Sequence, residues 1–208
     1  MMAMRLPLQT VALTLIIPTN IFNTHIRMKK TFFLLLLASL FLINCNNDDN
    51  DGDGPTDPLD ELPAATQTGA QTLGCLINGE PWVPPSIGAN RPNAFYQFVD
   101  GAYTLSISGV TGGGSESQQI IVGCVDIPEI IDEGMSYDLL DFQSGNYLAR
   151  YVAINAIDVS PSDDNPGVLT INRFDESIIS GTFEFTVLDN DGNEITITDG
   201  RFDLNYTN

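Results

Sequence analysis

The sequence predicts an all-β fold: a single antiparallel β-sandwich or partly open β-barrel that follows a signal peptide and a disordered acidic tether. From Thr72 onward, apolar and polar residues alternate with a period of two, which places one face of each strand in a core and the other in water. Turn-forming residues interrupt this pattern about every eight to twelve positions. No stretch has the caps and apolar stripe of an ordinary helix. We therefore expect one β domain over residues 72–208.

The individual strands follow from the alternation and from turn signals such as Asn78-Gly79 and Asp100-Gly101. Around Tyr103, for example, every second residue is apolar, and the residues between are threonine or serine. The clearest pattern is at the carboxyl end, where we expect four consecutive antiparallel strands. The expected strands are residues 73–78, 82–83, 94–99, 103–110, 118–125, 146–157, 168–173, 178–188, 193–198 and 201–206.

The amino-terminal region reads as an export signal. Lys29 and Lys30 precede an apolar run at residues 32–43, which is too short for an ordinary membrane-spanning helix, and Cys45 follows. Residues 42–45 resemble the lipobox of bacterial lipoproteins, which implies cleavage before Cys45 and acylation of its thiol. We expect residues 1–44 to be the signal-peptide region, with 1–27 an upstream extension and Met28 the true start.

Residues 45–71 are predicted to be a tether, because they are rich in aspartate, asparagine and proline and cannot bury enough apolar surface to fold. The acidic run after Cys45 resembles the surface-export signal of Bacteroidota lipoproteins. That resemblance implies a protein anchored by lipid in the cell outer membrane and displayed at the surface.

The acidic residues also offer oxygen ligands for calcium, which is the one possible cofactor. Asp49, Asp51 and Asp53 match the first spacings of an EF-hand loop, but prolines interrupt the loop and no helices flank it. Asp189 and Asp191 could also offer oxygen ligands. The alternative for Asp49, Asp51 and Asp53 is a solvated tether. The alternative for Asp189 and Asp191 is the ordinary hydrogen bonding of a hairpin turn.

Charge and composition exclude several classes of function. The net charge is −19, and all 27 acidic residues follow Cys45. Such a surface repels nucleic acid. No lysine or histidine follows Cys45, so serine–histidine and cysteine–histidine nucleophiles, P-loop chemistry and histidine-bearing zinc sites are excluded there. A carboxylate-pair hydrolase remains, with Glu184, Asp199 and Asp203 as candidate acids, although Glu184 alternates toward the solvated face.

Cys75 and Cys124 are the two cysteines left once Cys45 is acylated. In an oxidising exported compartment we expect them to form one disulfide, and two buried free thiols are the alternative.

Aromatic residues and arginines are the remaining candidates for ligand contacts. Trp82 is the residue we expect to stack on a sugar ring, in a platform with Tyr96, Phe98, Tyr103, Tyr147 and Tyr151, unless these side chains are simply core. Arg173 and Arg201 each precede Phe-Asp. They could clamp a ligand carboxylate, although pairing with neighbouring acids is the expected role.

Four segments, residues 72–84, 167–175, 179–185 and 197–203, resemble in order an uncharacterised domain-of-unknown-function family of Bacteroidota lipoproteins. The resemblance implies a layout of signal, lipobox, tether and β domain. It implies no established activity and assigns no catalytic residue.

The function that we expect is therefore a lipid-anchored, non-catalytic binding or accessory module for a glycan or protein partner. A structural or calcium-stabilised envelope protein is the alternative, and a carboxylate-based hydrolase is the third reading.

Overall fold

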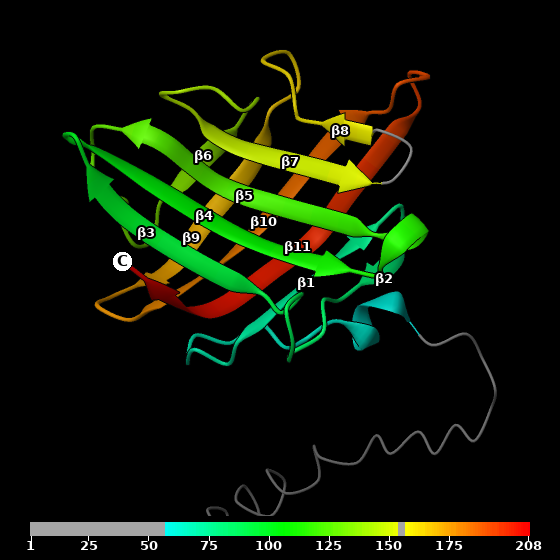
Figure 1. The fold of residues 1–208 in the computed structure, drawn as a ribbon, viewed down its shortest axis with the longest axis horizontal. Coiled ribbons are helices and arrows are strands. Elements are labelled where there is room, and N and C mark those ends of the chain that lie inside the picture. Colours follow the sequence, from blue (N-terminus) through cyan, green and yellow to red (C-terminus); the bar gives the residue numbers. More distant parts are fainter. Residues whose placement is uncertain (1–56, 154–156) are drawn as a thin grey trace, which may run out of the picture. The chain divides into compact units, whose positions relative to one another are not determined.

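A computed structural model describes residues 57–153 and 157–208, which belong to one strand-rich unit (Figure 1). Two short 3₁₀ helices accompany the strands. In chain order the elements are η1 (Pro58–Glu61), β1 (Thr72–Ile77), β2 (Glu80–Trp82), β3 (Asn93–Val99), β4 (Ala102–Thr111), η2 (Gly114–Glu116), β5 (Gln118–Ile127), β6 (Ser136–Leu139), β7 (Tyr147–Ala153), β8 (Ile157–Val159), β9 (Gly167–Phe174), β10 (Ile178–Leu188) and β11 (Glu194–Thr207).

The strands form two layers (Figure 1). One layer holds β3, β4, β5, β7 and β8, and the other holds β6, β9, β10, β11, β1 and β2. The predicted all-β class is confirmed. The sheet is not closed into a barrel, so the architecture is sandwich-like.

Strand β11 joins the two layers. Most of its length pairs antiparallel with β10 and β1, and its last residues then pair parallel with β3, Tyr206 opposite Ala94 and Thr207 opposite Phe95. On the other side, a single parallel bridge connects Leu140 with Leu148 of β7. The two layers are thus held together through backbone hydrogen bonds as well as through the core.

The core consists of the inward faces of both layers, as the period-two pattern predicts. Leu105 and Ile107 of β4 and Phe183 and Phe185 of β10 are buried, whereas Glu184 between the two phenylalanines is exposed. Burial of such side chains is the main stabilising contribution to a fold of this kind.

Two strand predictions are corrected. Residues 146–157 do not form one strand, because β7 ends at Ala153 and β8 pairs back against it. Residues 193–198 and 201–206 form the single strand β11, because Asp199 and Gly200 make a β-bulge opposite β10 instead of a turn. Asp199 has a φ of 54° there, a left-handed conformation that aspartate tolerates better than most residues.

The predicted disulfide is also corrected, since Cys75 and Cys124 are both free and buried. Burial raises the pKa of Tyr151, and the neighbouring Cys75 thiol adds to this shift. Cys124 lies instead opposite Tyr147, four residues earlier on β7. Burial raises the pKa of both thiols, that of Cys124 to about 11, so neither is reactive.

The folded unit begins earlier than the predicted boundary at residue 72. Leu62 is buried, and residues 66–70 hydrogen-bond to β11, so the last part of the predicted tether lies on the domain. Within residues 57–153 and 157–208, no helix is long and apolar enough to cross a membrane.

Candidate functional site

A cluster of aromatic rings lies at the end of the sandwich where β3 turns into β4. Tyr96 stacks on Tyr103 with ring centroids 5.3 Å apart, and Phe98 packs on Tyr103 at 4.6 Å. From the other layer, Phe174 and Tyr206 meet Tyr96 edge-on at 5.0 and 6.2 Å. Five rings from β3, β4, β9 and β11 therefore come together beside the point where β11 pairs with β3.

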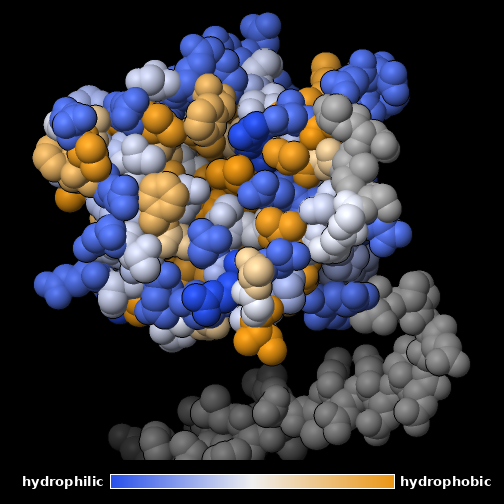
Figure 2. All heavy atoms as spheres, viewed as in Figure 1, coloured by the Kyte–Doolittle hydropathy of each residue, from blue (hydrophilic) through white to orange (hydrophobic). Residues whose placement is uncertain are grey.

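Part of this cluster is open to solvent. Phe98 and Val99 are 60% and 59% exposed, although both are large apolar residues. A hollow of about 600 Å³ lies beside them, lined by Tyr96, Gln97, Phe98, Val99, Tyr206 and Asn208. Figure 2 shows apolar side chains gathered at the end of the molecule where Figure 1 places the β3–β4 hairpin.

Two of the three tyrosine hydroxyls of the cluster, those of Tyr96 and Tyr206, have internal partners. The Tyr96 oxygen accepts a hydrogen bond from the Ile131 amide at 3.5 Å, and burial raises its pKa to about 12. The Tyr206 hydroxyl donates to the Asp175 carbonyl at 2.7 Å. The exposed side chains of β3 beside the hollow are those of Gln97, Phe98 and Val99.

Sequence reasoning named Tyr96, Phe98 and Tyr103 but missed Val99, Phe174 and Tyr206. One signal was present: Phe98 and Val99 are consecutive, so they must point to opposite faces of β3, and at least one must leave the core. Nothing in the pattern could show that Phe98, which lies on the core side with Tyr96, extends past the end of the second layer.

Trp82 does not belong to this cluster. It lies on β2 and is only 3% exposed, so it cannot stack on a ligand from solvent, and our assignment of it as the ligand-stacking residue is corrected. Its indole nitrogen has no hydrogen-bond partner within the described part of the chain. Tyr151 is also buried, and Tyr147 stacks on Tyr137 with centroids 4.0 Å apart.

A second polar constellation surrounds Asp203, which is 1% exposed. Its carboxylate accepts hydrogen bonds from the Thr66 hydroxyl at 2.6 Å and from the amides of Thr68, Gly69 and Ala70 at 2.8, 2.7 and 3.1 Å. Burial by itself raises the pKa of Asp203, but these bonds together outweigh it and hold the pKa below its ordinary value. We call Asp203 and residues 66–70 the clasp.

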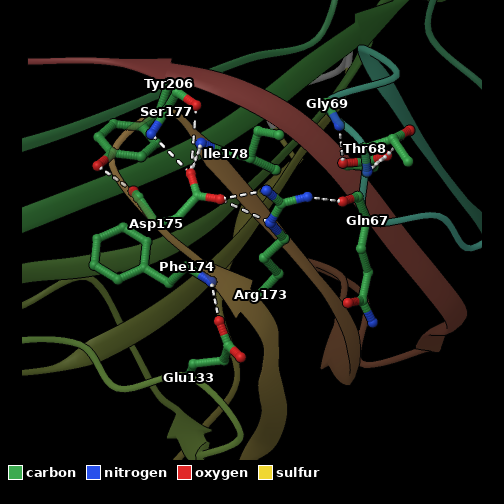
Figure 3. Close-up of polar contacts among 11 residues, drawn as sticks. Gln67, Thr68, Gly69, Glu133, Arg173, Phe174, Asp175, Ser177, Ile178 and Tyr206 are labelled. Atoms are coloured by element: carbon green, nitrogen blue, oxygen red, sulfur yellow. Dashed lines mark hydrogen bonds and ion pairs between the residues drawn. The ribbon is translucent and has the colours of Figure 1, made fainter.

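Arg173 extends the clasp, as Figure 3 shows. Its Nε donates to Asp175 at 2.8 Å, and its Nη1 donates to the carbonyl oxygen of Gln67. The Ser177 and Ile178 amides lower the pKa of Asp175 to about 2, and Arg173 contributes to the same shift. Because three of its nitrogens are engaged, Arg173 is a structural tie and not an open carboxylate clamp.

The candidate acids of a hydrolase do not form a catalytic pair. Glu184 and Asp199 line one hollow of about 470 Å³ on the outer face of β10 and β11, together with Arg201, whose Nε donates to the Asp199 carbonyl at 3.2 Å. Both acids are exposed, whereas a general acid requires a shielded environment. The carboxylate oxygens of Asp203 already accept hydrogen bonds within the clasp.

The predicted calcium ligands are only partly within the described residues. Asp49, Asp51 and Asp53 lie outside them. Asp189 accepts hydrogen bonds from the amides of Asp191 and Asn193 at 2.9 and 2.8 Å, and the Asn193 side chain, the largest influence, lowers its pKa. In the described ranges no three Asp, Glu, Cys or His residues are grouped to hold a metal ion. Asp189 thus organises the β10–β11 hairpin.

Comparison of the chain with protein-family models, with curated proteins and with solved structures finds no match to any of them.

Proposed function

We propose that this chain is a lipid-anchored protein of the cell outer membrane, displayed at the surface, whose β domain is a non-catalytic binding module. The ligand-contacting surface in this proposal is the open aromatic end: Phe98 and Val99 with the hollow beside them. The partner is a glycan or a protein.

The anchoring part of the proposal is supported by the sequence. The basic residues, the short apolar run and Cys45 have the order of a lipoprotein signal, and the acidic run after Cys45 resembles a surface-export signal. The resemblance of residues 72–84, 167–175, 179–185 and 197–203 to Bacteroidota lipoproteins supports the same placement.

The binding part rests on one observation: two large apolar side chains are exposed on a strand edge beside a hollow, and packed rings support them from behind. Exposed apolar groups cost solvation free energy, and clusters of them commonly mark interaction sites. A purely structural protein would have no need for this opening, and a hydrolase would need a shielded acid pair that the hollow at Glu184 and Asp199 does not provide.

Anchoring is tested by producing the chain with and without Cys45→Ser in a bacterium that processes lipoproteins, with an alkyne fatty acid in the medium. The unaltered chain should incorporate label and pellet with membranes, and Cys45→Ser should do neither. Protease treatment of intact cells then reports surface display. Equal labelling of both chains would overturn the anchor.

Binding is tested with the mature chain, residues 45–208 carrying Cys45→Ser, on glycan and surface-protein arrays. Any specific ligand should bind at least about tenfold more weakly to Phe98→Ser, since an exposed aromatic anchor is lost. Leu188→Ser is the matched control, because Leu188 is 59% exposed and lies at the far end of β10. A ligand equally insensitive to both variants would place the binding site elsewhere.

A further inference from the structure

The hollow beside Phe98 is the unpaired edge of a β-strand. All seven residues of β3 pair with β4, but β11 pairs with β3 only at Ala94 and Phe95. Among the described residues, none forms a backbone ladder with the other edge of Tyr96–Val99. The same four residues line the hollow. This edge of β3 therefore borders the hollow, which Tyr206 and Asn208 at the end of β11 also line.

The other strands at the borders of the sheet differ from β3 in ways that discourage pairing. Strand β2 has three residues and contains Pro81. Strand β8 also has three, and Asp158 at its centre is ion-paired with Arg150. Strand β6 has four and carries the exposed Asp138. Short strands, prolines and charges are the usual protections of a sheet edge. The open segment Tyr96-Gln97-Phe98-Val99 is also short, but it contains neither a proline nor a charged residue.

From this contrast we infer that the open edge of β3 binds an extended segment of a partner protein, which adds to the sheet as a strand. The inference rests on the proposed function and names the ligand class for the same surface. Backbone hydrogen bonds to residues 96–99 would supply affinity, and apolar side chains of the segment would cover Phe98.

The charges around this edge indicate the chemistry of the segment. Asp100 follows Val99 directly and is exposed. Glu133 accepts a hydrogen bond at 3.0 Å from the amide of Phe174, whose ring packs on Tyr96. Arg173, the arginine near this cluster, is already paired with Asp175. A basic segment with alternating apolar residues therefore fits, whereas a second copy of this chain would bring its own net charge of −19 and be repelled.

The test uses the mature chain with Cys45→Ser and a capped, fluorescent nonapeptide in which lysine alternates with valine, followed by anisotropy. We expect binding that is lost when glutamate replaces lysine. Two further peptides carry N-methyl groups on every lysine or on every valine nitrogen. Successive N–H groups of a strand point to opposite edges, so at least one of these two peptides should bind about tenfold more weakly at unchanged charge.

The outcomes separate the inference from the proposed function. Equal affinity of the chain for all three lysine peptides would mean purely ionic attraction and would overturn strand addition. Equal affinity of the unmethylated lysine peptide for Phe98→Ser and Leu188→Ser would overturn it too. Absence of peptide binding, with a glycan that binds in a Phe98-dependent way, would overturn the inference and leave the proposed function standing. Weaker peptide binding by Phe98→Ser, together with weaker binding of one N-methylated peptide, supports the inference of strand addition.

Discussion

Strand β11 carries two sites only three residues apart that differ in how completely their polar groups are satisfied. At Asp203, a carboxylate accepts hydrogen bonds from a segment of the chain more than a hundred residues away, and the site is closed to water. At Tyr206, β11 begins to pair with β3 but reaches only Phe95, and the rest of the β3 edge is open. The clasp stabilises the molecule, and the open edge is suited to an interaction.

The difference follows from what lies next to each site. Residues 66–70 cover Asp203, and Gly69 makes this possible with a φ of 75° and a carbonyl that accepts from the Asn205 side chain at 3.2 Å. No segment within residues 57–153 and 157–208 covers Phe98 in this way. Variants of the two sites should therefore separate stability from binding.

The largest effect is expected for Asp203→Ala. Removing the carboxylate leaves the amides of Thr68, Gly69 and Ala70 without their acceptor, which should lower the free energy of unfolding by about 3 kcal/mol. Urea denaturation of the mature Cys45→Ser chain measures this. Glu184→Ala, on the exposed face of β10, is the control and should change stability by less than about 0.5 kcal/mol. Similar losses for both variants would contradict the clasp.

Acid should weaken the clasp as well. The pKa of folded Asp203 lies below the value of about 3.9 of an unfolded chain, so the folded state binds fewer protons. Its contribution to stability is fully present above pH about 4 and is lost as the pH falls through the folded pKa. Urea denaturation measures the free energy of unfolding of the unaltered chain and of Asp203→Asn. The difference between the two should therefore shrink as the pH falls from 5 to 2. A constant difference across this range would be inconsistent with a charged Asp203.

Arg173→Gln should have a smaller and more local effect. The ion pair with Asp175 is partly exposed, so global stability should change little. Loss of the contact with Gln67 should instead speed amide hydrogen exchange at residues 67–70 by about fivefold, through easier local opening. Arg150→Gln removes the comparably exposed ion pair with Asp158 and should leave exchange in this segment unchanged.

The smallest change in stability is expected at the open end. Phe98→Ser removes a ring that is mostly in water and packs mainly on Tyr103, so the free energy of unfolding should fall by less than about 1 kcal/mol. Differential scanning calorimetry of Phe98→Ser and of the control Leu188→Ser, each compared with the unaltered chain, measures this loss. A large loss would show that Phe98 is part of the core, and the open end would then have a structural role.

Much of the fold was predictable because its signals are local. The alternation of Phe183, Phe185 and Val187 with Thr182, Glu184 and Thr186 places β10 correctly, since adjacent side chains of a strand must point to opposite faces. The Asp189–Gly192 hairpin was predictable because aspartate, asparagine and glycine are the residues that favour tight turns. Asp199-Gly200 carries a similar signal but forms a bulge, because β10 continues to pair with β11 on both sides of it.

The candidate site was only partly predictable. Trp82 and Phe98 are both aromatic residues in short strand patterns, yet Trp82 belongs to the buried core cluster between the layers and Phe98 is 60% exposed. The disulfide prediction was wrong because composition and compartment suggest a pair of cysteines without giving the distance between them. The lipid anchor at Cys45 stays a prediction, since it lies outside the described residues.

By itself the sequence determined most of the strands, although not β6, together with their inward faces and the acidic character of the surface, because each depends on residue type and on neighbours a few positions away. The tertiary structure alone decided that residues 66–70 close over Asp203, a contact between Thr66 and Asp203 that spans 137 positions. It alone decided that the last residues of β11 lie beside β3, with Tyr206 opposite Ala94 and Thr207 opposite Phe95. Both are contacts between residues more than a hundred positions apart, and a one-dimensional pattern does not contain that information.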